Sequence, residues 1–187
     1  MATILITGTN KGVGLELVKI YAARGDTVIA TCRDPESASA LSEVGGAVEV
    51  LGVSVGDDVS VASLAKALEG RVIDVLINNA GTSGPARDQQ TTFAMDFEGW
   101  ADAFNINSMA PVRVMQALLP NLRLSSAAKV MTVTSQMGAL SLDMPAAHAY
   151  CATKAAVNKF MRLAALDLKK ENIAVGLVHP GWVKTDM

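Results

Sequence analysis

Short apolar runs alternate with amphipathic stretches along the chain, and this alternation predicts the fold. The run Thr-Val-Ile-Ala at residues 27–30 is typical, because it is short, rich in β-branched residues and followed by polar positions. Runs of this kind form buried strands. We expect six strands, at residues 4–6, 27–30, 47–53, 73–77, 129–134 and 173–178.

The segments between the strands show helical spacing. Val13, Leu17 and Ile20 recur at the spacing of one helix face. Asp57 and Asp58 are good candidates for a helix N-cap. We expect helices at residues 12–24, weakly from 35 onward, at 57–68, at 96–119 with a kink at Pro111, and at 148–170, with a long polar loop at 80–95.

Strands that alternate with helices form βαβ units and a parallel sheet. The strands are apolar on both faces, as expected when helices cover the sheet on both sides. A length of 187 residues is that of one domain. The sequence therefore predicts a doubly wound, Rossmann-like α/β fold in a single domain that spans residues 1–187.

Composition and charge exclude several protein classes. Hydrophobic residues make up 50% of the chain and charged residues 18%, which excludes a disordered protein. A net charge of −2 without a basic cluster argues against nucleic-acid binding. No long apolar run or signal peptide is present, so we expect a cytoplasmic protein without a membrane span. Cys32 and Cys151 fit no disulfide or metal pattern, and we expect no metal.

The first strand is followed by a glycine-rich turn. Residues 7–14 read Thr-Gly-Thr-Asn-Lys-Gly-Val-Gly and lead into the first predicted helix. Glycines allow a sharp turn and a close approach of the backbone to a ligand. The free N–H groups and partial positive charge of a helix N-terminus suit a pyrophosphate. The turn is thus a variant of the dinucleotide-binding fingerprint.

Two cations near this turn bear on the cofactor. Arg33 follows the second strand, where an acidic residue would bind the ribose 2′-hydroxyl of NAD and an arginine accommodates the 2′-phosphate of NADP. Lys11 lies in the glycine-rich turn itself. Two cations can form a charge-assisted clamp on one phosphate. The sequence favours NADP(H) over NAD(H).

Three further residues suggest proton transfer. Tyr150 and Lys154 are four positions apart on a predicted helix, so they share one face. A neighbouring ammonium lowers the pKa of a phenol, which then can exchange a proton with a carbonyl that receives a hydride. Ser135 follows the fifth strand, where its hydroxyl points into the crevice in which α/β proteins bind ligands.

Taken together, these motifs resemble the short-chain dehydrogenase/reductase family in order and over essentially the whole length of the chain. The sequence around residues 179–183 and the opening 6–10 are most similar to the C-factor and Sniffer-type carbonyl reductase branch. The matching motifs are the turn at residues 7–14, Asn-Asn-Ala-Gly at 78–81, Asn107, Ser135, Tyr150 with Lys154, and Pro180-Gly181.

The resemblance implies an oxidoreductase that acts on a small-molecule carbonyl or alcohol, in a homodimer or homotetramer. Tyr150 would be the general acid/base, Lys154 would lower its pKa and bind the nicotinamide ribose, and Ser135 would hold the substrate oxygen. Asn107 would fix a water for proton relay. The implied cofactor-binding residues are Gly8, Thr9, Asn10, Lys11, Gly12, Val13, Gly14, Arg33, Ser54, Val55, Asn79, Ala80, Gly81, Tyr150, Lys154, Pro180, Gly181, Val183 and Thr185.

The chain departs from the family pattern in two places. Ser54 and Val55 stand where many members have an aspartate that meets the adenine. The sequence ends at Met187, before the substrate-covering segment and final strand with which members normally continue. From the resemblance we therefore expect a fold that lacks that strand and lid.

Two other functions remain open on sequence grounds. Residues 52–56 match the G-x-S-x-G elbow of serine hydrolases, with Ser54 as nucleophile and Asp74 and His179 following in the required order. A cofactor-binding sensor or interaction protein without turnover is also possible, because a fold does not determine a function.

Overall fold

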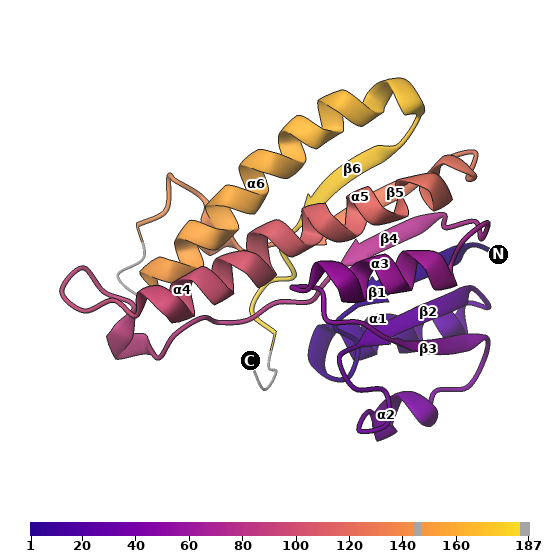
Figure 1. The fold of residues 1–187 in the computed structure, drawn as a ribbon, viewed down its shortest axis with the longest axis horizontal. Helices are drawn as coiled ribbons and strands as arrows, with labels where there is room; N and C mark the ends of the chain where they lie inside the picture. The colour runs from indigo at the N-terminus through magenta and orange to yellow at the C-terminus, as the bar shows by residue number, and fades with distance from the viewer. Residues whose placement is uncertain (144–146, 184–187) are drawn as a thin grey trace.

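The protein forms one parallel sheet with helices on both faces (Figure 1). The computed structural model describes residues 1–143 and 147–183. In this part of the chain the sheet has six strands in the order β3-β2-β1-β4-β5-β6, and every pair is parallel. All six predicted strands are confirmed. Their bounds are β1 Thr3–Thr7, β2 Thr27–Cys32, β3 Val48–Gly52, β4 Val75–Asn78, β5 Lys129–Val133 and β6 Ala174–Val178.

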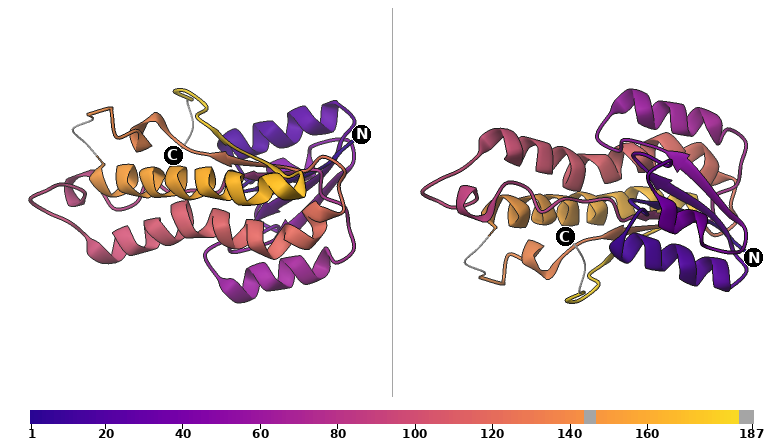
Figure 2. Two further views of the ribbon diagram at one scale, coloured as in Figure 1. Left: turned by 90° about the horizontal axis from the view of Figure 1, so that it is seen from above. Right: turned by 90° about the horizontal axis from the view of Figure 1, so that it is seen from below.

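The helices form two layers that enclose the sheet (Figure 2). One layer holds α1 (Gly12–Ala23) and the short α2 (Ser39–Ser42), and the other holds α3 (Asp58–Ala67), α5 (Ala110–Arg123) and α6 (His148–Leu168). Each layer has its own apolar core. In β1, Leu5 packs into the core below α3, α5 and α6, whereas Ile4 and Ile6 pack into the core below α1. The unbroken apolar run of β1 follows from this double coverage.

The predicted helix at residues 96–119 is interrupted. The structure has α4 (Phe97–Phe104), a π-helical turn at Asn105–Met109 and then α5. Pro111 has no N–H to offer to the carbonyl of Asn107, so the regular α-helical ladder cannot continue there. The irregularity therefore begins one turn before the proline at which the kink was predicted. Such π-helical turns often mark functional sites.

Two other segments differ less from their predicted secondary structure. The weak helix predicted from residue 35 is the single turn α2, and the polar loop at 80–95 contains a 3-10 turn at Arg87–Gln89. The remaining predicted helices agree with α1, α3 and α6 within a few residues at their ends. Asp57 caps α3, as its position predicted, and accepts a hydrogen bond from the backbone N–H of Ser60.

The strand order reverses its direction at β1. From β1 the chain proceeds outward through β2 and β3, and it then returns to place β4 on the other side of β1. The helices after β1 and β4 consequently leave the sheet on opposite faces, and ligands bind at the carboxyl ends of such neighbouring strands. The glycine-rich turn after β1 and the segment after β4 both lie at this point.

Within the described residues, no helix combines the length and the apolar character needed to cross a membrane. The same residues contain no group of His, Cys, Asp or Glu side chains placed to hold a metal ion.

Candidate active site

The glycine-rich turn is packed so tightly that two of its glycines have no room for a side chain. A Cβ on Gly8 would lie 2.7 Å from the Cα of Ala80, and a Cβ on Gly14 would lie 2.2 Å from the carbonyl oxygen of Gly8. Gly8 and Gly12 also have φ angles of +71° and +57°, which L-residues rarely adopt. Glycine is therefore strongly favoured at these positions.

The segment after β4 holds this turn in place. The Asn79 side-chain amide donates to the carbonyl oxygens of Thr7 (3.0 Å) and Gly8 (2.9 Å). The backbone N–H groups of Asn79 and Ala80 donate to the Thr7 hydroxyl. Thr9 anchors the far side through a hydroxyl bond to the Thr31 carbonyl at 3.1 Å. Strands β1, β2 and β4 therefore fix the turn together.

The N-terminus of α1 is open. Its N-cap residue, Lys11, makes no side-chain capping bond, whereas Asp57 and Asp96 cap α3 and α4. The first N–H groups of α1 consequently need acceptors from elsewhere. Lys11 and Arg33 are exposed beside this turn and add positive charge. A tight glycine cradle, an uncapped helix start and two cations fit a dinucleotide pyrophosphate with a further phosphate.

We predict that Gly14→Ala disrupts this cradle. The new methyl group would meet the Gly8 carbonyl and the Asn79 amide, which lie 2.2 Å and 2.6 Å from its ideal position. The overpacking should lower the free energy of unfolding by about 1–3 kcal/mol. Urea unfolding measures this loss. Gly45→Ala is the matched control, because nothing lies within 4 Å of its Cβ position. Equal effects at both positions would contradict the prediction.

The predicted adenine-side residues lie at the ends of neighbouring strands. Arg33 follows β2 and Ser54 follows β3, which pairs with β2. Val55 is buried, and Ser54 donates its backbone N–H to the Ser60 hydroxyl at 2.9 Å. The carboxyl ends of β1, β2 and β3 thus bring the glycine-rich turn, Arg33 and Ser54 to one edge of the sheet.

A clamp that the sequence did not reveal connects this edge to the π-helical turn. Arg113 donates to the Val55 carbonyl (3.1 Å) and to the Asn105 side-chain oxygen (3.1 Å), and it pairs with Asp58. Asn105 in turn donates to the Gly56 carbonyl at 2.9 Å. Arg113 on α5 resembles any helix-surface arginine in sequence, so no local signal could have identified it.

The structure brings Ser135, Tyr150 and Lys154 together. Ser135 follows β5, and its hydroxyl shares a hydrogen bond with the Tyr150 phenol. The Lys154 ammonium lies 5.7 Å from the centroid of the Tyr150 ring and donates to the Val133 carbonyl at 3.1 Å. Gly138 permits this packing, because a Cβ there would lie 2.6 Å from the backbone carbon of Lys154.

The ionisation of the pair differs in part from the expectation. Burial lowers the pKa of Lys154 from 10.5 to about 8. Burial also raises the pKa of Tyr150, although its hydrogen bond with Ser135 acts in the opposite direction. The sequence had suggested that Lys154 lowers the Tyr150 pKa. In the structure desolvation dominates, and the ammonium is bound to the Val133 carbonyl.

Asn107 lies beside these residues at the π-helical turn. Its amide nitrogen donates to the Thr82 carbonyl (2.8 Å) and the Thr153 hydroxyl (3.1 Å), and its amide oxygen accepts the Thr82 N–H at 2.9 Å. A Cβ on Gly81 would lie 3.2 Å from the Asn107 oxygen and 3.9 Å from the Lys154 ammonium. The four predicted catalytic residues therefore share one site.

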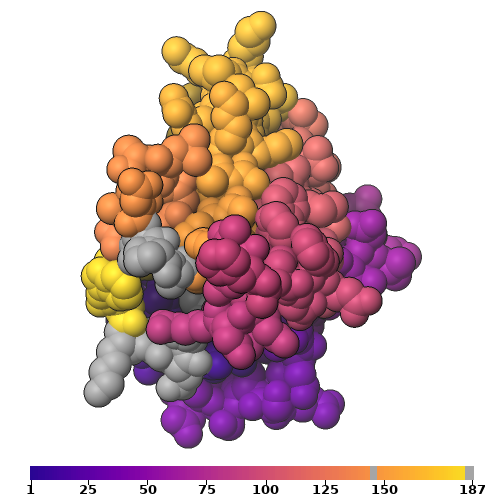
Figure 3. Space-filling view, turned by 90° about the vertical axis from the view of Figure 1, so that its left-hand side faces the viewer, coloured from indigo at the N-terminus to yellow at the C-terminus, as the bar shows by residue number. Residues whose placement is uncertain are grey.

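Residues 179–183, which follow β6, lie on the surface. Pro180, Gly181 and Val183 are exposed, and Gly181 has a φ of +82°. Thr185, the remaining predicted cofactor contact, lies outside the described residues. Figure 3 views the end of the molecule at which the segments after β5 and β6 reach the surface.

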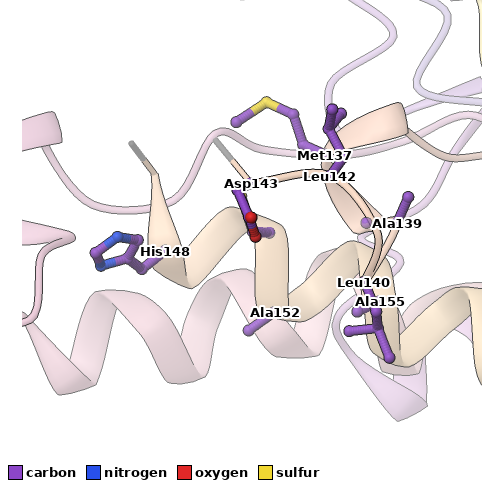
Figure 4. Close-up of a pocket in the computed structure, with 10 residues that line it drawn as sticks. Met137, Ala139, Leu140, Leu142, Asp143, His148, Ala152 and Ala155 are labelled. Atoms are coloured by element: carbon purple, nitrogen blue, oxygen red, sulfur yellow. The ribbon is translucent and has the colours of Figure 1, made fainter. Parts of the chain in front are cut away.

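A cavity of about 620 Å³ opens between the segment at residues 137–143 and the first turns of α6 (Figure 4). On α6 it is bounded by the helix face that carries His148, Cys151, Ala152 and Ala155. Most of the lining is apolar, and Asp143 and His148 add polar groups. The lining residues are Met137, Gly138, Ala139, Leu140, Leu142, Asp143, His148, Cys151, Ala152 and Ala155.

The structure does not assemble the serine hydrolase triad. Asp74 precedes β4, at the amino edge of the sheet, where it accepts the Thr3 N–H (2.8 Å) and the Ser125 hydroxyl (2.7 Å). Ser54 and His179 follow β3 and β6, which are the two outermost strands. This alternative is therefore wrong, because the parallel sheet separates the three side chains.

Comparisons with known proteins agree with this geometry. The profile of the short chain dehydrogenase family matches residues 2–187. C-signal of Myxococcus xanthus is 43% identical over 116 residues, which are 62% of this chain and 68% of that protein. An NADPH-bound carbonyl reductase from chicken fatty liver superposes with a TM-score of 0.91 at 29% identity, covering 100% of this chain and 82% of the other. The carbonyl reductase Sniffer of D. melanogaster gives 0.91 at 27% identity, with 100% and 83% covered.

Proposed function

This chain belongs to the short-chain dehydrogenase family, and from that premise we propose that it transfers a hydride between NADP(H) and a carbonyl/alcohol pair. The observation that carries the proposal is the Ser135–Tyr150 hydroxyl pair beside the buried Lys154 ammonium, at the carboxyl edge of the sheet that holds the glycine-rich turn. The nicotinamide, when bound, supplies or accepts the hydride.

In the proposed reduction Tyr150 gives its proton to the substrate oxygen. Its raised pKa keeps the phenol protonated at neutral pH, which is the form that donates. Ser135 already shares a hydrogen bond with the phenol, so it can orient the same substrate oxygen. In the oxidation direction the two residues act in reverse, and Tyr150 accepts the proton of the alcohol.

Lys154 and Asn107 support this exchange. The buried ammonium of Lys154 stabilises the phenolate that remains after proton donation, because charges interact strongly where water is excluded. The same ammonium would hold the nicotinamide ribose. The Asn107 amide oxygen and the Lys154 ammonium both lie near the Cβ position of Gly81, and Asn107 would place a water that returns the proton to the site.

The cofactor would lie across the carboxyl ends of β1 to β4. Gly8, Gly12, Gly14 and the start of α1 would hold the pyrophosphate, and Asn79 and Ala80 support that turn. Gly81 would contact the cofactor. Ser54 and Val55 would meet the adenine, and Pro180, Gly181 and Val183 the nicotinamide side. Two exposed cations, Lys11 and Arg33, support a preference for NADP(H), and a structural neighbour is described as NADPH-bound.

We predict that Arg33→Asp reverses the cofactor preference. The carboxylate repels a 2′-phosphate and accepts a hydrogen bond from a 2′-hydroxyl. Loss of one charge-assisted bond should weaken NADPH binding by about 10- to 100-fold, while NADH binding is unchanged or tighter. Titration calorimetry with both cofactors measures the ratio of the NADPH and NADH dissociation constants. Lys19→Asp, on the exposed surface of α1, is the charge control; an unchanged ratio for Arg33→Asp would remove Arg33 from the phosphate site.

The cavity between residues 137–143 and α6 would receive the rest of the substrate. Its lining is mainly Met, Leu and Ala, which suits an apolar body attached to the reacting carbonyl. A small-molecule ketone or aldehyde with an apolar substituent is therefore the proposed substrate class.

We also propose that the chain forms a homodimer or homotetramer through α4 and α5. Phe97, Phe104 and Met109 are partly or largely exposed there, at 72%, 36% and 49%. An oligomer would cover such side chains. Sedimentation velocity of the parent chain and of Phe97→Glu tests this assignment, which predicts a smaller particle for the variant.

The function is tested first by cofactor binding and then by turnover. Calorimetry should show NADPH binding that is tighter than NADH binding. A screen of apolar aldehydes and ketones, followed by the loss of NADPH absorbance, should then reveal reduction. Absence of cofactor binding would contradict the proposal at its first step.

A second candidate is a cofactor-binding sensor or interaction protein without turnover. The name of one relative, C-signal, favours it. Binding of NADPH without reduction of any carbonyl would support this candidate, whereas turnover that requires Tyr150 would exclude it.

A further inference from the structure

Gln90 is a buried amide with no part in the chemistry described so far. It lies in the loop between β4 and α4, and only 2% of its surface is exposed. Its side-chain nitrogen donates to the carbonyls of Ser83, at 3.0 Å, and Pro85. Its side-chain oxygen accepts the backbone N–H of Tyr150 at 3.1 Å. Both ends of the amide are therefore engaged.

Gln90 also completes the start of α6. The residue at the N-cap, Ala147, has a φ of +55° and no side-chain acceptor. An alanine leaves the first N–H groups of a helix without partners. The Gln90 backbone carbonyl accepts the His148 N–H at 3.2 Å, and its side chain accepts the Tyr150 N–H. The cap of α6 thus comes from a residue 60 positions away in the chain.

The loop that carries Gln90 is anchored at its other end to Asn107. The Thr82 N–H and carbonyl bind the two ends of the Asn107 amide, at 2.9 Å and 2.8 Å. Ser83 and Pro85, bound by Gln90, lie directly after Thr82. Residues 82–90, which we call the strap, therefore connect the π-helical turn to the first turn of α6.

We propose that Gln90 is a positioning residue: its amide fixes the first turn of α6 against the strap and thereby sets where the Tyr150 phenol lies relative to Ser135. Ser135 belongs to a different element, the segment after β5, so their hydrogen bond depends on the placement of α6. The role for catalysis rests on the proposed function. Whether or not the protein reduces a carbonyl, the contact with the Tyr150 backbone makes Gln90 a determinant of the position of the phenol.

Two substitutions test the two ends of the amide. Gln90→Met preserves the length of the side chain and removes its hydrogen bonds. Gln90→Glu retains an acceptor for the Tyr150 N–H but faces the Ser83 and Pro85 carbonyls with a carboxylate. Because a protonated carboxyl can donate to one of those carbonyls, the activity of Gln90→Glu relative to the parent should rise as the pH falls.

Asn121→Leu is the matched control. Asn121 is also buried, at 3% exposure, and its amide nitrogen donates to the carbonyls of Leu68 (2.6 Å) and Arg71 (2.8 Å). These contacts lie near the start of β4, at the opposite edge of the sheet from Tyr150. The control therefore loses a comparable buried amide without touching α6 or the strap.

For Gln90→Met we expect kcat to fall while NADPH binding is retained. A displaced phenol should lower kcat by about 10- to 100-fold, because small misplacements of reacting groups have effects of that size. The KM for NADPH should change little, since Gln90 does not contact the glycine-rich turn. Asn121→Leu should lower the melting temperature but retain the parent kcat.

A second readout does not require activity. The chain has two tyrosines, so in a Tyr21→Phe background the near-ultraviolet titration reports Tyr150 alone. Loss of the Ser135 hydrogen bond should raise the Tyr150 pKa further in Gln90→Met, because that bond lowers it. Hydrogen exchange at neutral pH should show the first turn of α6 exchanging about fivefold faster, as expected when a helix cap is lost.

The outcomes separate the two proposals. If Gln90→Met matches Asn121→Leu in kcat, in the Tyr150 titration and in exchange at the start of α6, the positioning role is overturned. If the parent chain reduces no carbonyl, the proposed function fails, and titration and exchange still decide whether Gln90 positions Tyr150.

Discussion

Replacing Tyr150 by phenylalanine lowers kcat for carbonyl reduction by about 10²- to 10⁴-fold, the usual contribution of a positioned general acid. The variant removes only the hydroxyl that shares a hydrogen bond with Ser135. The ring and its packing remain, so NADPH affinity stays within a few-fold of the parent value. Steady-state kinetics and calorimetry on the same preparations measure the two effects.

Tyr21→Phe provides the control for this substitution. Tyr21 lies on α1, away from the site, and its ring stacks with the Arg24 guanidinium at 5.1 Å. It should leave kcat unchanged. A Tyr150→Phe enzyme that retains turnover would show that another group donates the proton. A joint loss of turnover and NADPH binding would point to a structural role of the phenol instead.

Lys154→Met should abolish efficient turnover and at the same time stabilise the cofactor-free protein. The ammonium is buried, and its pKa in the native protein is about 8, compared with 10.5 for an ordinary lysine. This difference corresponds to a free-energy cost of ~3 kcal/mol for burying the charge. Methionine fills the same space without charge. Because the bond to the Val133 carbonyl is also lost, the expected gain in unfolding free energy at pH 7 is about 1–3 kcal/mol.

The direction in which the stability gain of Lys154→Met changes with pH shows whether the buried charge of Lys154 is its cause. Between pH 8 and 10.5 the unfolded chain binds a proton at Lys154 more tightly than the native protein does. The stability contribution of this group therefore rises with pH through that window, because deprotonation removes the penalty of burying the charge. The stability advantage of Lys154→Met should be constant below about pH 8 and shrink as the pH approaches 10.5.

Urea unfolding at several pH values measures this advantage, and NADPH oxidation assays measure the lost turnover. Lys159→Met is the control on the same helix, because Lys159 is exposed and no burial penalty is relieved. A Lys154→Met protein that is less stable than the parent at pH 7 would mean that the ammonium stabilises the native fold. Retained turnover would remove Lys154 from the catalytic site.

The architecture could be predicted from the sequence because the patterns that indicate strands and helix caps involve residues close together in the chain. A buried parallel strand is apolar on both faces, and β1, β2 and β4 each show this pattern over a few consecutive residues. Asp57 was identifiable as a cap for the same reason, since the Ser60 N–H that donates to its carboxylate lies three positions away. The order of strands and helices then left a parallel, doubly wound sheet as the architecture.

The candidate site was predictable where short motifs carry it. The glycine-rich turn and the Tyr150–Lys154 spacing depend on neighbours in the chain, and the structure places both at the carboxyl edge of the sheet. The pKa of Tyr150 was not predictable in this way. Its direction depends on burial, and burial is a property of the assembled fold.

What the sequence by itself determined about this protein is therefore the set of elements, their order and the candidate side chains of the site. Only the tertiary structure decided how those side chains are held. Gln90 meets Tyr150 across 60 residues and Arg113 meets Val55 across 58, through an ordinary glutamine and an ordinary arginine. Hydrogen bonds over such separations arise when packed layers bring distant segments together, and that packing leaves no periodic trace in the local sequence.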